Sequence, residues 1–173
     1  GAAVSPEQIE GPPRPADFDS FWARKLTELR TVPENTKLTR SDSGKQGIDY
    51  ALLQMNHVNG TKVHGQIAQP SAPGKYPAML ILQWAGGPYR LWSPWVVDRA
   101  AEGWIALNIQ PHNVLPTEPQ SYYDSLPQQL KYYGAIGSGD REKSYFVEMY
   151  LRGVRAADYL TQLPNWDGKT LLV

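Results

Sequence analysis

Two short apolar runs at residues 78–84 and 104–109, each with a single polar residue, constrain the fold of this chain more than any other feature. Each run is too short for a helix and lacks polar alternation, as expected of a strand buried on both faces. Between them, residues 95–101 have helical spacing, and Gly103 ends that pattern. A strand, a helix and a strand in this order predict two neighbouring parallel strands with a right-handed connection.

Two more helices are predicted, one before and one after this unit. The first begins at Asp17, which can cap it, and Pro33 forbids its continuation. The second occupies residues 144–163 and ends at Pro164. Each has one apolar stripe that must lie on another part of the protein. The residues at helical spacing are Phe18, Phe21, Trp22, Lys25, Leu26 and Leu29 in the first helix and Phe146, Tyr150, Val154, Ala157 and Leu160 in the second.

Residues 50–58 and 61–69 predict a β-hairpin, because Asn59-Gly60 between them tolerates positive φ at both positions of a type I′ turn. Residues 170–173 begin another strand.

Together the elements predict an α/β fold with three layers and a mostly parallel sheet that starts with an antiparallel hairpin. Residues 1–16, rich in proline, are expected to form an extended arm, and residues 17–173 to form part of a single domain. Half of the sheet would be missing, so we expect folding to need a complementary C-terminal piece.

Composition excludes several classes of function. The chain has 173 residues, and its 17 basic side chains balance 17 acidic ones, so no net field attracts nucleic acid or an anionic membrane. It has no cysteine, which excludes disulfides, thiolate metal sites and a cysteine nucleophile. Serine or carboxylate chemistry remains. No membrane-spanning stretch or signal-peptide pattern is present in the sequence as given, and a secreted, periplasmic or cytoplasmic location is left open.

Short motifs spread from residue 16 to residue 173 carry a family resemblance. They are DFDSFW at 17–22, NG at 59–60, KYPA at 75–78, GG at 86–87, GW at 103–104, YF at 145–146, MYLR at 149–152, RAADYL at 155–160 and WDGK at 166–169. In their order and spacing the chain resembles the N-terminal half of the acetyl xylan esterase and cephalosporin C deacetylase family, the seventh carbohydrate esterase family.

The resemblance implies an α/β-hydrolase that removes acetyl groups from sugars or related small esters by two-step acyl transfer, without a cofactor. Such enzymes carry a Ser, Asp, His triad in that order, with the Ser on a G-x-S-x-G turn between a strand and a helix. The strand that begins at residue 170 matches the one before this turn, so the whole triad is expected beyond Val173. Gly137-Ser138-Gly139 has the wrong frame and lies in a loop. Family members form closed rings, which implies a homo-oligomer.

One catalytic element is expected inside the chain. In this fold one oxyanion donor is a backbone N–H in the loop after an earlier strand, and that loop matches residues 83–89. The resemblance assigns the donor N–H to Trp84, while Gly86 and Gly87 allow the backbone to approach a substrate. A plain tight turn is the alternative explanation of the glycine pair.

The loop at residues 110–115 follows the next strand, at the edge of the sheet where ligands bind in open α/β folds. His112 and Asn113 are therefore predicted to border the substrate pocket. Better-known family members carry an Arg-Gly-Gln-Gly-like stretch here, so no role is inherited, and a structural histidine is the alternative. His112 is not the triad histidine, which comes last in the chain order.

His57 and His64 raise the possibility of a metal site, which the hairpin argues against. Counted from a two-residue turn, His57 lies opposite Lys62 and diagonal to His64, and that face offers Lys62 and Met55 rather than further ligands. No metal is predicted. The charged run at 140–143 is interpreted as the solvated or salt-bridged entry to a helix, and Arg141 could instead reach a neighbouring subunit.

Two other functions stay open from sequence. The many Trp and Tyr side chains are compatible with a non-catalytic carbohydrate-binding protein. An α/β-hydrolase that acts on another ester or on an amide is the second. A G-x-S-x-G turn downstream of Val173 would decide between enzyme and binding protein.

Overall fold

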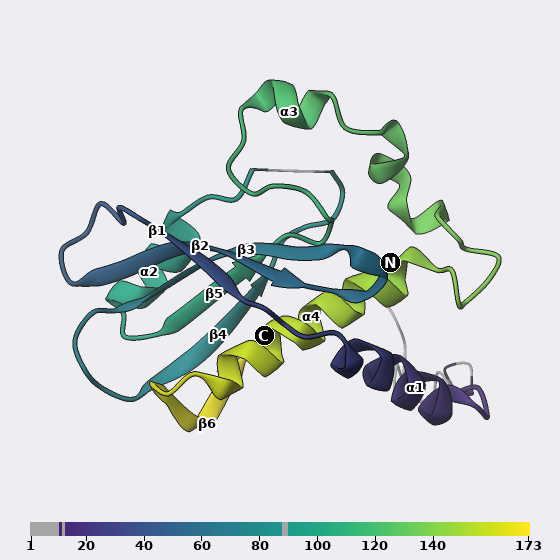
Figure 1. The fold of residues 1–173 in the computed structure, drawn as a ribbon, viewed down its shortest axis with the longest axis horizontal. Helices are drawn as coiled ribbons and strands as arrows, with labels where there is room; N and C mark the ends of the chain where they lie inside the picture. The colour runs from purple at the N-terminus through teal and green to yellow at the C-terminus, as the bar shows by residue number, and fades with distance from the viewer. Residues whose placement is uncertain (1–10, 12, 88–89) are drawn as a thin grey trace, which may run out of the picture.

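The computed structural model describes residues 11, 13–87 and 90–173 and contains one six-stranded sheet flanked by helices (Figure 1). The helices within these residues are α1 (Phe18–Thr31), α2 (Pro94–Ala101), α3 (Gln120–Asp124) and α4 (Tyr145–Gln162), with short 3-10 segments η2 (Val58–Gly60) and η3 (Gln128–Ala135). The strands are β1 (Lys37–Ser41), β2 (Ile48–Asn56), β3 (Lys62–Pro70), β4 (Tyr76–Leu82), β5 (Ile105–Ile109) and β6 (Trp166–Leu172).

The predicted strand, helix, strand unit is confirmed. The strand order is β1-β2-β3-β5-β4-β6, and β4 lies parallel to β5 on one side and to β6 on the other. The strands from β1 to β3, and the β3–β5 pair, are antiparallel. The antiparallel part is larger than predicted because β1 was missed. Every side chain of β1 is exposed, so this strand has no buried face to produce an apolar alternation.

The hairpin is confirmed, but the prediction of a two-residue turn is wrong. Asn56 pairs with Lys62, so five residues connect β2 to β3 and the register is shifted by one. Asn59 and Gly60 do have positive φ, at 56° and 70°. The extra residues bury Val58 against α1 and α4, where it packs with Leu29 and Leu151. This packing outweighs the local preference for a two-residue turn.

Helices cover both faces of the sheet, as a three-layer fold requires. On one face α2 packs on β2, β3 and β5, and on the other α4 covers β4, β5 and β6. Figure 1 shows α4 running along the sheet, with α1 beside it as an outer helix. Between β5 and α4 the chain makes a long excursion that carries α3 and η3.

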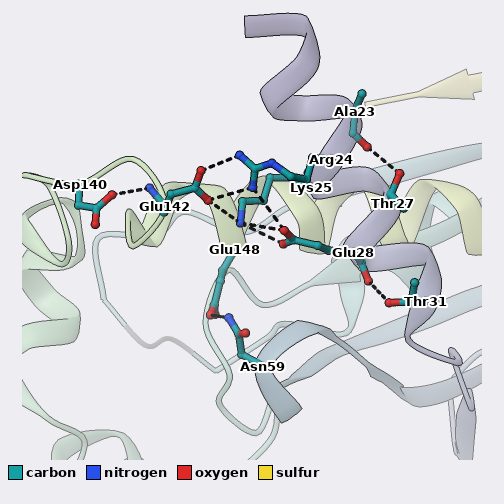
Figure 2. Close-up of polar contacts among 10 residues, drawn as sticks. All are labelled: Ala23, Arg24, Lys25, Thr27, Glu28, Thr31, Asn59, Asp140, Glu142 and Glu148. Atoms are coloured by element: carbon teal, nitrogen blue, oxygen red, sulfur yellow. Dashed lines mark hydrogen bonds and ion pairs between the residues drawn. The ribbon is translucent and has the colours of Figure 1, made fainter. Parts of the chain in front are cut away.

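Charged side chains attach α1 to the segment that enters α4 (Figure 2). Glu142 accepts from Arg24 at 2.6 Å and from Lys25 at 2.9 Å. Asp17 forms no side-chain cap on α1, contrary to prediction, because its carboxylate pairs with Arg141 at 2.5 Å. The predicted salt-bridged entry to α4 is therefore present, with a partner for Arg141 inside the same chain.

Candidate active site

The carboxyl ends of the parallel strands β4, β5 and β6 meet at one edge of the sheet. The loop after β4, residues 83–87 as far as it is described, and the loop at 110–115 after β5 both lie there. A hydrogen bond between the ring of His112 and the carbonyl of Ala85 joins them, at 3.2 Å. Sequence reasoning thus selected two loops that the fold brings into contact. Residues 88 and 89 of the first loop lie outside the described residues.

The loop after β4 remains extended at first and then bends. The Gln83 N–H donates to the Ile109 carbonyl of β5 at 3.4 Å, and Ala85 is buried. The indole of Trp84 is 71% exposed and lies against Gly86, where an added Cβ would be 2.4 Å from the ring. Any larger residue at position 86 would have to displace this indole. The donor role of the Trp84 N–H and the substrate contacts of Gly86 and Gly87 stay predictions.

His112 is completely buried, with both ring nitrogens in hydrogen bonds. Nε2 lies 3.2 Å from the Ala85 carbonyl, and Nδ1 lies 2.8 Å from the Tyr145 hydroxyl at the start of α4. The Tyr133 ring packs edge-on against the imidazole. Burial lowers the pKa of His112, opposed by the bond to Ala85 and assisted by the charge of Arg152. The ring is therefore neutral at physiological pH, and its predicted contact with substrate stays untested.

Asn113 is exposed and connects the second loop to the hairpin. Its side-chain oxygen accepts from the Lys62 N–H at 3.0 Å, at the start of β3. The amide therefore has a structural partner in this chain. Its predicted contact with substrate, like that of His112, stays a prediction.

Two supports of this edge were missed in the sequence. Arg152 of α4 is fully buried, and its Nη1 donates to the Pro111 carbonyl at 3.4 Å while its Nη2 approaches Glu148 at 3.2 Å. Gln66 of β3, also fully buried, donates to the Trp92 carbonyl at 2.9 Å and so fixes the chain that leads into α2. Gln66 shares its strand face with Lys62 and His64, and Arg152 lies within one helical turn of Glu148 and Arg155, so neither residue stood out from its neighbours in the sequence.

The register shift changes the placement expected of His57 and His64, the pair for which no metal was predicted. His57 lies in the connection, with Nδ1 3.1 Å from the Thr61 hydroxyl, while His64 pairs with Gln54 inside the ladder. Within the described ranges no three His, Cys, Asp or Glu side chains are grouped as metal ligands would be.

None of the described helices has the length and apolar character needed to cross a membrane.

The sequence profile of the acetyl xylan esterase (AXE1) family matches residues 9–173. The chain belongs to this family. Acetyl esterase Axe7A of Xylanibacter ruminicola is 31% identical to it over 168 residues, which are 92% of this chain and 37% of that protein. The family resemblance seen in the sequence motifs is confirmed.

Solved structures of acetyl xylan esterases share the fold. Acetyl xylan esterase 1 from Thermoanaerobacterium sp. JW/SL YS485 superposes with a TM-score of 0.75 at 20% identity, covering 92% of this chain and 50% of that chain. The acetyl xylan esterase from Paenibacillus sp. R4 gives 0.76 at 19% identity, covering 95% and 53%. The predicted α/β-hydrolase class is confirmed. The chain spans about half the length of these structures and little more than a third of Axe7A.

Proposed function

We propose that the protein containing this chain is a serine esterase that removes acetyl groups from acetylated sugars or related small esters. The family match over residues 9–173 carries this proposal, since the relatives in that family are carboxylic ester hydrolases. The fold adds support, because the loop after β4 occupies the edge where α/β-hydrolases place an oxyanion donor. The near-neutral charge suits an uncharged substrate.

Within this enzyme the loop at 83–87 supplies one of two oxyanion donors, and the Trp84 N–H is our first candidate. Support comes from the alternation of backbone groups along an extended chain. The Gln83 N–H and the Ala85 carbonyl both bond on the β5 side. The backbone groups of Trp84, which lies between them, then face β6. The nucleophile turn is expected directly after that strand.

The reaction follows two-step acyl transfer. A serine hydroxyl attacks the acetyl carbonyl carbon and passes its proton to a histidine, and the oxyanion is held by two N–H donors. The carbon–oxygen bond to the sugar then breaks, and the sugar hydroxyl leaves with that proton. Water, activated by the same histidine, releases acetate and restores the serine. All three triad residues are expected beyond Val173, and no cofactor is required.

Acetate release by the full-length protein tests the proposal. With acetylated xylan and with a small acetyl ester as substrates, we expect release that a serine-directed organophosphate abolishes. Binding of xylo-oligosaccharides without any hydrolysis would instead support a carbohydrate-binding protein. Preference for a longer acyl ester or an amide would indicate a different hydrolase. Light scattering of the same sample tests the expected homo-oligomer.

A further inference from the structure

We infer that His112 is a positioning residue whose neutral imidazole, with its tautomer fixed by Tyr145, holds the Ala85–Gly86 peptide of the oxyanion loop in one orientation. The inference rests on the proposed function for the identity of that loop. It assigns to His112 a role that acts through the backbone of another segment and not through contact with substrate.

The hydrogen bonds determine which ring nitrogen carries the proton. A carbonyl oxygen only accepts, so the Nε2 atom 3.2 Å from the Ala85 oxygen must be protonated. In a neutral ring Nδ1 is then an acceptor, and the Tyr145 hydroxyl 2.8 Å away must donate to it. The chain of donors therefore runs in one direction, from Tyr145 through His112 to Ala85.

The surroundings leave this arrangement little freedom. His112 has no exposed surface, and the rings of Tyr133 and Tyr145 pack against it with centroids 5.7 Å away in each case. Arg152 donates to the carbonyl of the preceding residue, Pro111, and so fixes the backbone from which the imidazole projects. A buried ring with both nitrogens satisfied and its backbone tethered is a rigid support.

Fixing the Ala85 carbonyl has a direct consequence for the amide that follows. None of the described peptide bonds is cis, and in a trans peptide the C=O and the next N–H point in opposite directions. With the Ala85 oxygen directed at the buried imidazole, the Gly86 N–H points away from His112. In the extended chain this is also the side of the Trp84 N–H, the candidate donor. The latch, formed by Tyr145, His112 and Ala85, thereby holds the part of the loop that presents this donor to a developing negative charge, a geometry on which oxyanion stabilisation depends.

Two substitutions at one position separate the parts of the latch. In His112→Asn the short amide reaches Tyr145, as Nδ1 does, but offers no donor to Ala85. In His112→Gln the longer amide presents an N–H near the Nε2 position and restores the bond to Ala85. Tyr145→Phe removes the hydroxyl that fixes the tautomer and leaves the imidazole in place.

Kinetics of the full-length enzyme on an acetyl ester give the first readout. We expect His112→Asn to lower kcat by about 10-fold to 100-fold with little change in KM, as misplacement of a transition-state donor does. His112→Gln should recover most of that loss. The control His57→Asn alters another buried histidine, on the hairpin connection, and should leave kcat unchanged. Tyr76→Phe, which removes a hydroxyl bond to the Ala72 carbonyl at the other end of β4, is the control for Tyr145→Phe.

Histidine-selective NMR gives a second readout that needs no activity. Long-range proton–nitrogen correlations should show His112 as the Nε2–H tautomer in the wild type, and Tyr145→Phe should introduce the other tautomer. Amide hydrogen exchange in residues 84–87 should accelerate in His112→Asn and return towards the wild-type rate in His112→Gln.

Equal kcat losses in the two His112 variants, a normal kcat in His112→Asn, or an Nδ1–H tautomer in the wild type would each overturn the latch. A wild-type protein that hydrolyses no ester would refute the proposed function. In that case the tautomer and the exchange rates of the loop still decide whether His112 holds it.

Discussion

At the scale of single residues, the main chain and the side chain of Trp84 have separable roles. The backbone is our candidate oxyanion donor, whereas the indole is largely exposed and covers Gly86. We expect Trp84→Phe to retain most activity, because the N–H remains and an aromatic ring still packs. Trp84→Pro removes the N–H and should lower kcat by roughly 10² to 10³, or about 3 to 4 kcal/mol.

Proline also restrains the backbone, so near-UV circular dichroism of Trp84→Pro must match the wild type before the rate is interpreted. A folded Trp84→Pro enzyme with near-normal kcat would contradict the assignment. The donor would then be sought at Ala85 or Gly86.

The buried His57 gives the protein a dependence of stability on pH. Burial lowers its pKa to about 3, and the charges of Arg152 and Arg155 act in the same direction. The unfolded chain takes up this proton near pH 6.5 and the folded protein only near pH 3, so unfolding binds protons between these values. The stability that this group contributes is therefore present above pH 6.5 and is lost as the pH falls towards 3, by about 1.4 kcal/mol per pH unit.

Urea unfolding between pH 7 and pH 4 measures this effect in the wild type and in His57→Asn. The free energy of unfolding should fall less steeply with acidification in the variant, because one buried imidazole has been removed. The pKa values of His64 and His112 are also lowered by burial, so some slope should remain. Identical slopes in the two proteins would show that His57 is protonated in the folded state.

At the scale of elements, sequence patterns predicted those strands and helices that bury one face or both. The fully buried β5 and the striped helix α4 fall in this group. β1 was missed because all of its side chains are exposed, and the hairpin register was wrong because the burial of Val58 is a tertiary effect. Hydrophobic periodicity indicates which face of an element is buried. A strand that buries none of its side chains and is held only by backbone hydrogen bonds therefore has no such pattern.

The candidate site divides in the same way. His112 was found because its loop follows a predicted strand of the parallel unit, and the loop at 83–87 was found because the family resemblance places an oxyanion donor there. Tyr145, which fixes His112, is 33 residues away in sequence, and Arg152 lies 41 residues from Pro111, to which it donates. Local spacing carries no information about such partners, so the supports of a loop become visible only in the folded chain.

The attachment of α1 to the entry of α4 depends on Glu142. Hydrogen bonds from Arg24, and then from Lys25, lower the pKa of Glu142 from its ordinary 4.5 to about 2. A carboxyl with a lowered folded pKa stabilises the protein above pH 4.5 and loses that contribution as the pH falls to 2. We therefore expect Glu142→Gln to be less stable than the wild type at pH 7, with the difference closing over this interval and shrinking in high salt.

Urea titrations of both proteins at several pH values, each with and without added salt, measure that difference. Glu102→Gln is a matched control, because Glu102 pairs with Arg99 near the end of one helix and joins no separate elements. Its effect should be smaller. A Glu142→Gln protein as stable as the wild type at pH 7 and low salt would show that these ion pairs do not hold α1.

At the scale of the whole molecule, large apolar side chains are exposed at the carboxyl ends of both β4 and β6. Leu82 is 56% exposed, Leu172 50% and Val173 72%, and Trp84 from the adjoining loop is exposed as well. Among the described residues β6 pairs only with β4, so its other edge offers unpaired backbone groups. Exposed apolar side chains beside an open strand edge favour association with another chain or segment.

We therefore expect the 173 residues expressed alone to be insoluble or molten, with bound hydrophobic dye, weak near-UV dichroism and no cooperative heat transition. The reason is that α2 and α4 bury the two faces of the sheet but leave the edge of β6 uncovered.

Co-expression with a piece that starts directly after Val173 in the full-length protein should restore solubility, because a strand added there would pair with β6 and cover Leu172. The matched control is the same co-expression with Leu172→Asp, which places a charge on the surface to be buried and should prevent rescue. A sharp, cooperative melt from a monomeric sample of the 173 residues would show instead that the core around β4 and β5 is sufficient on its own.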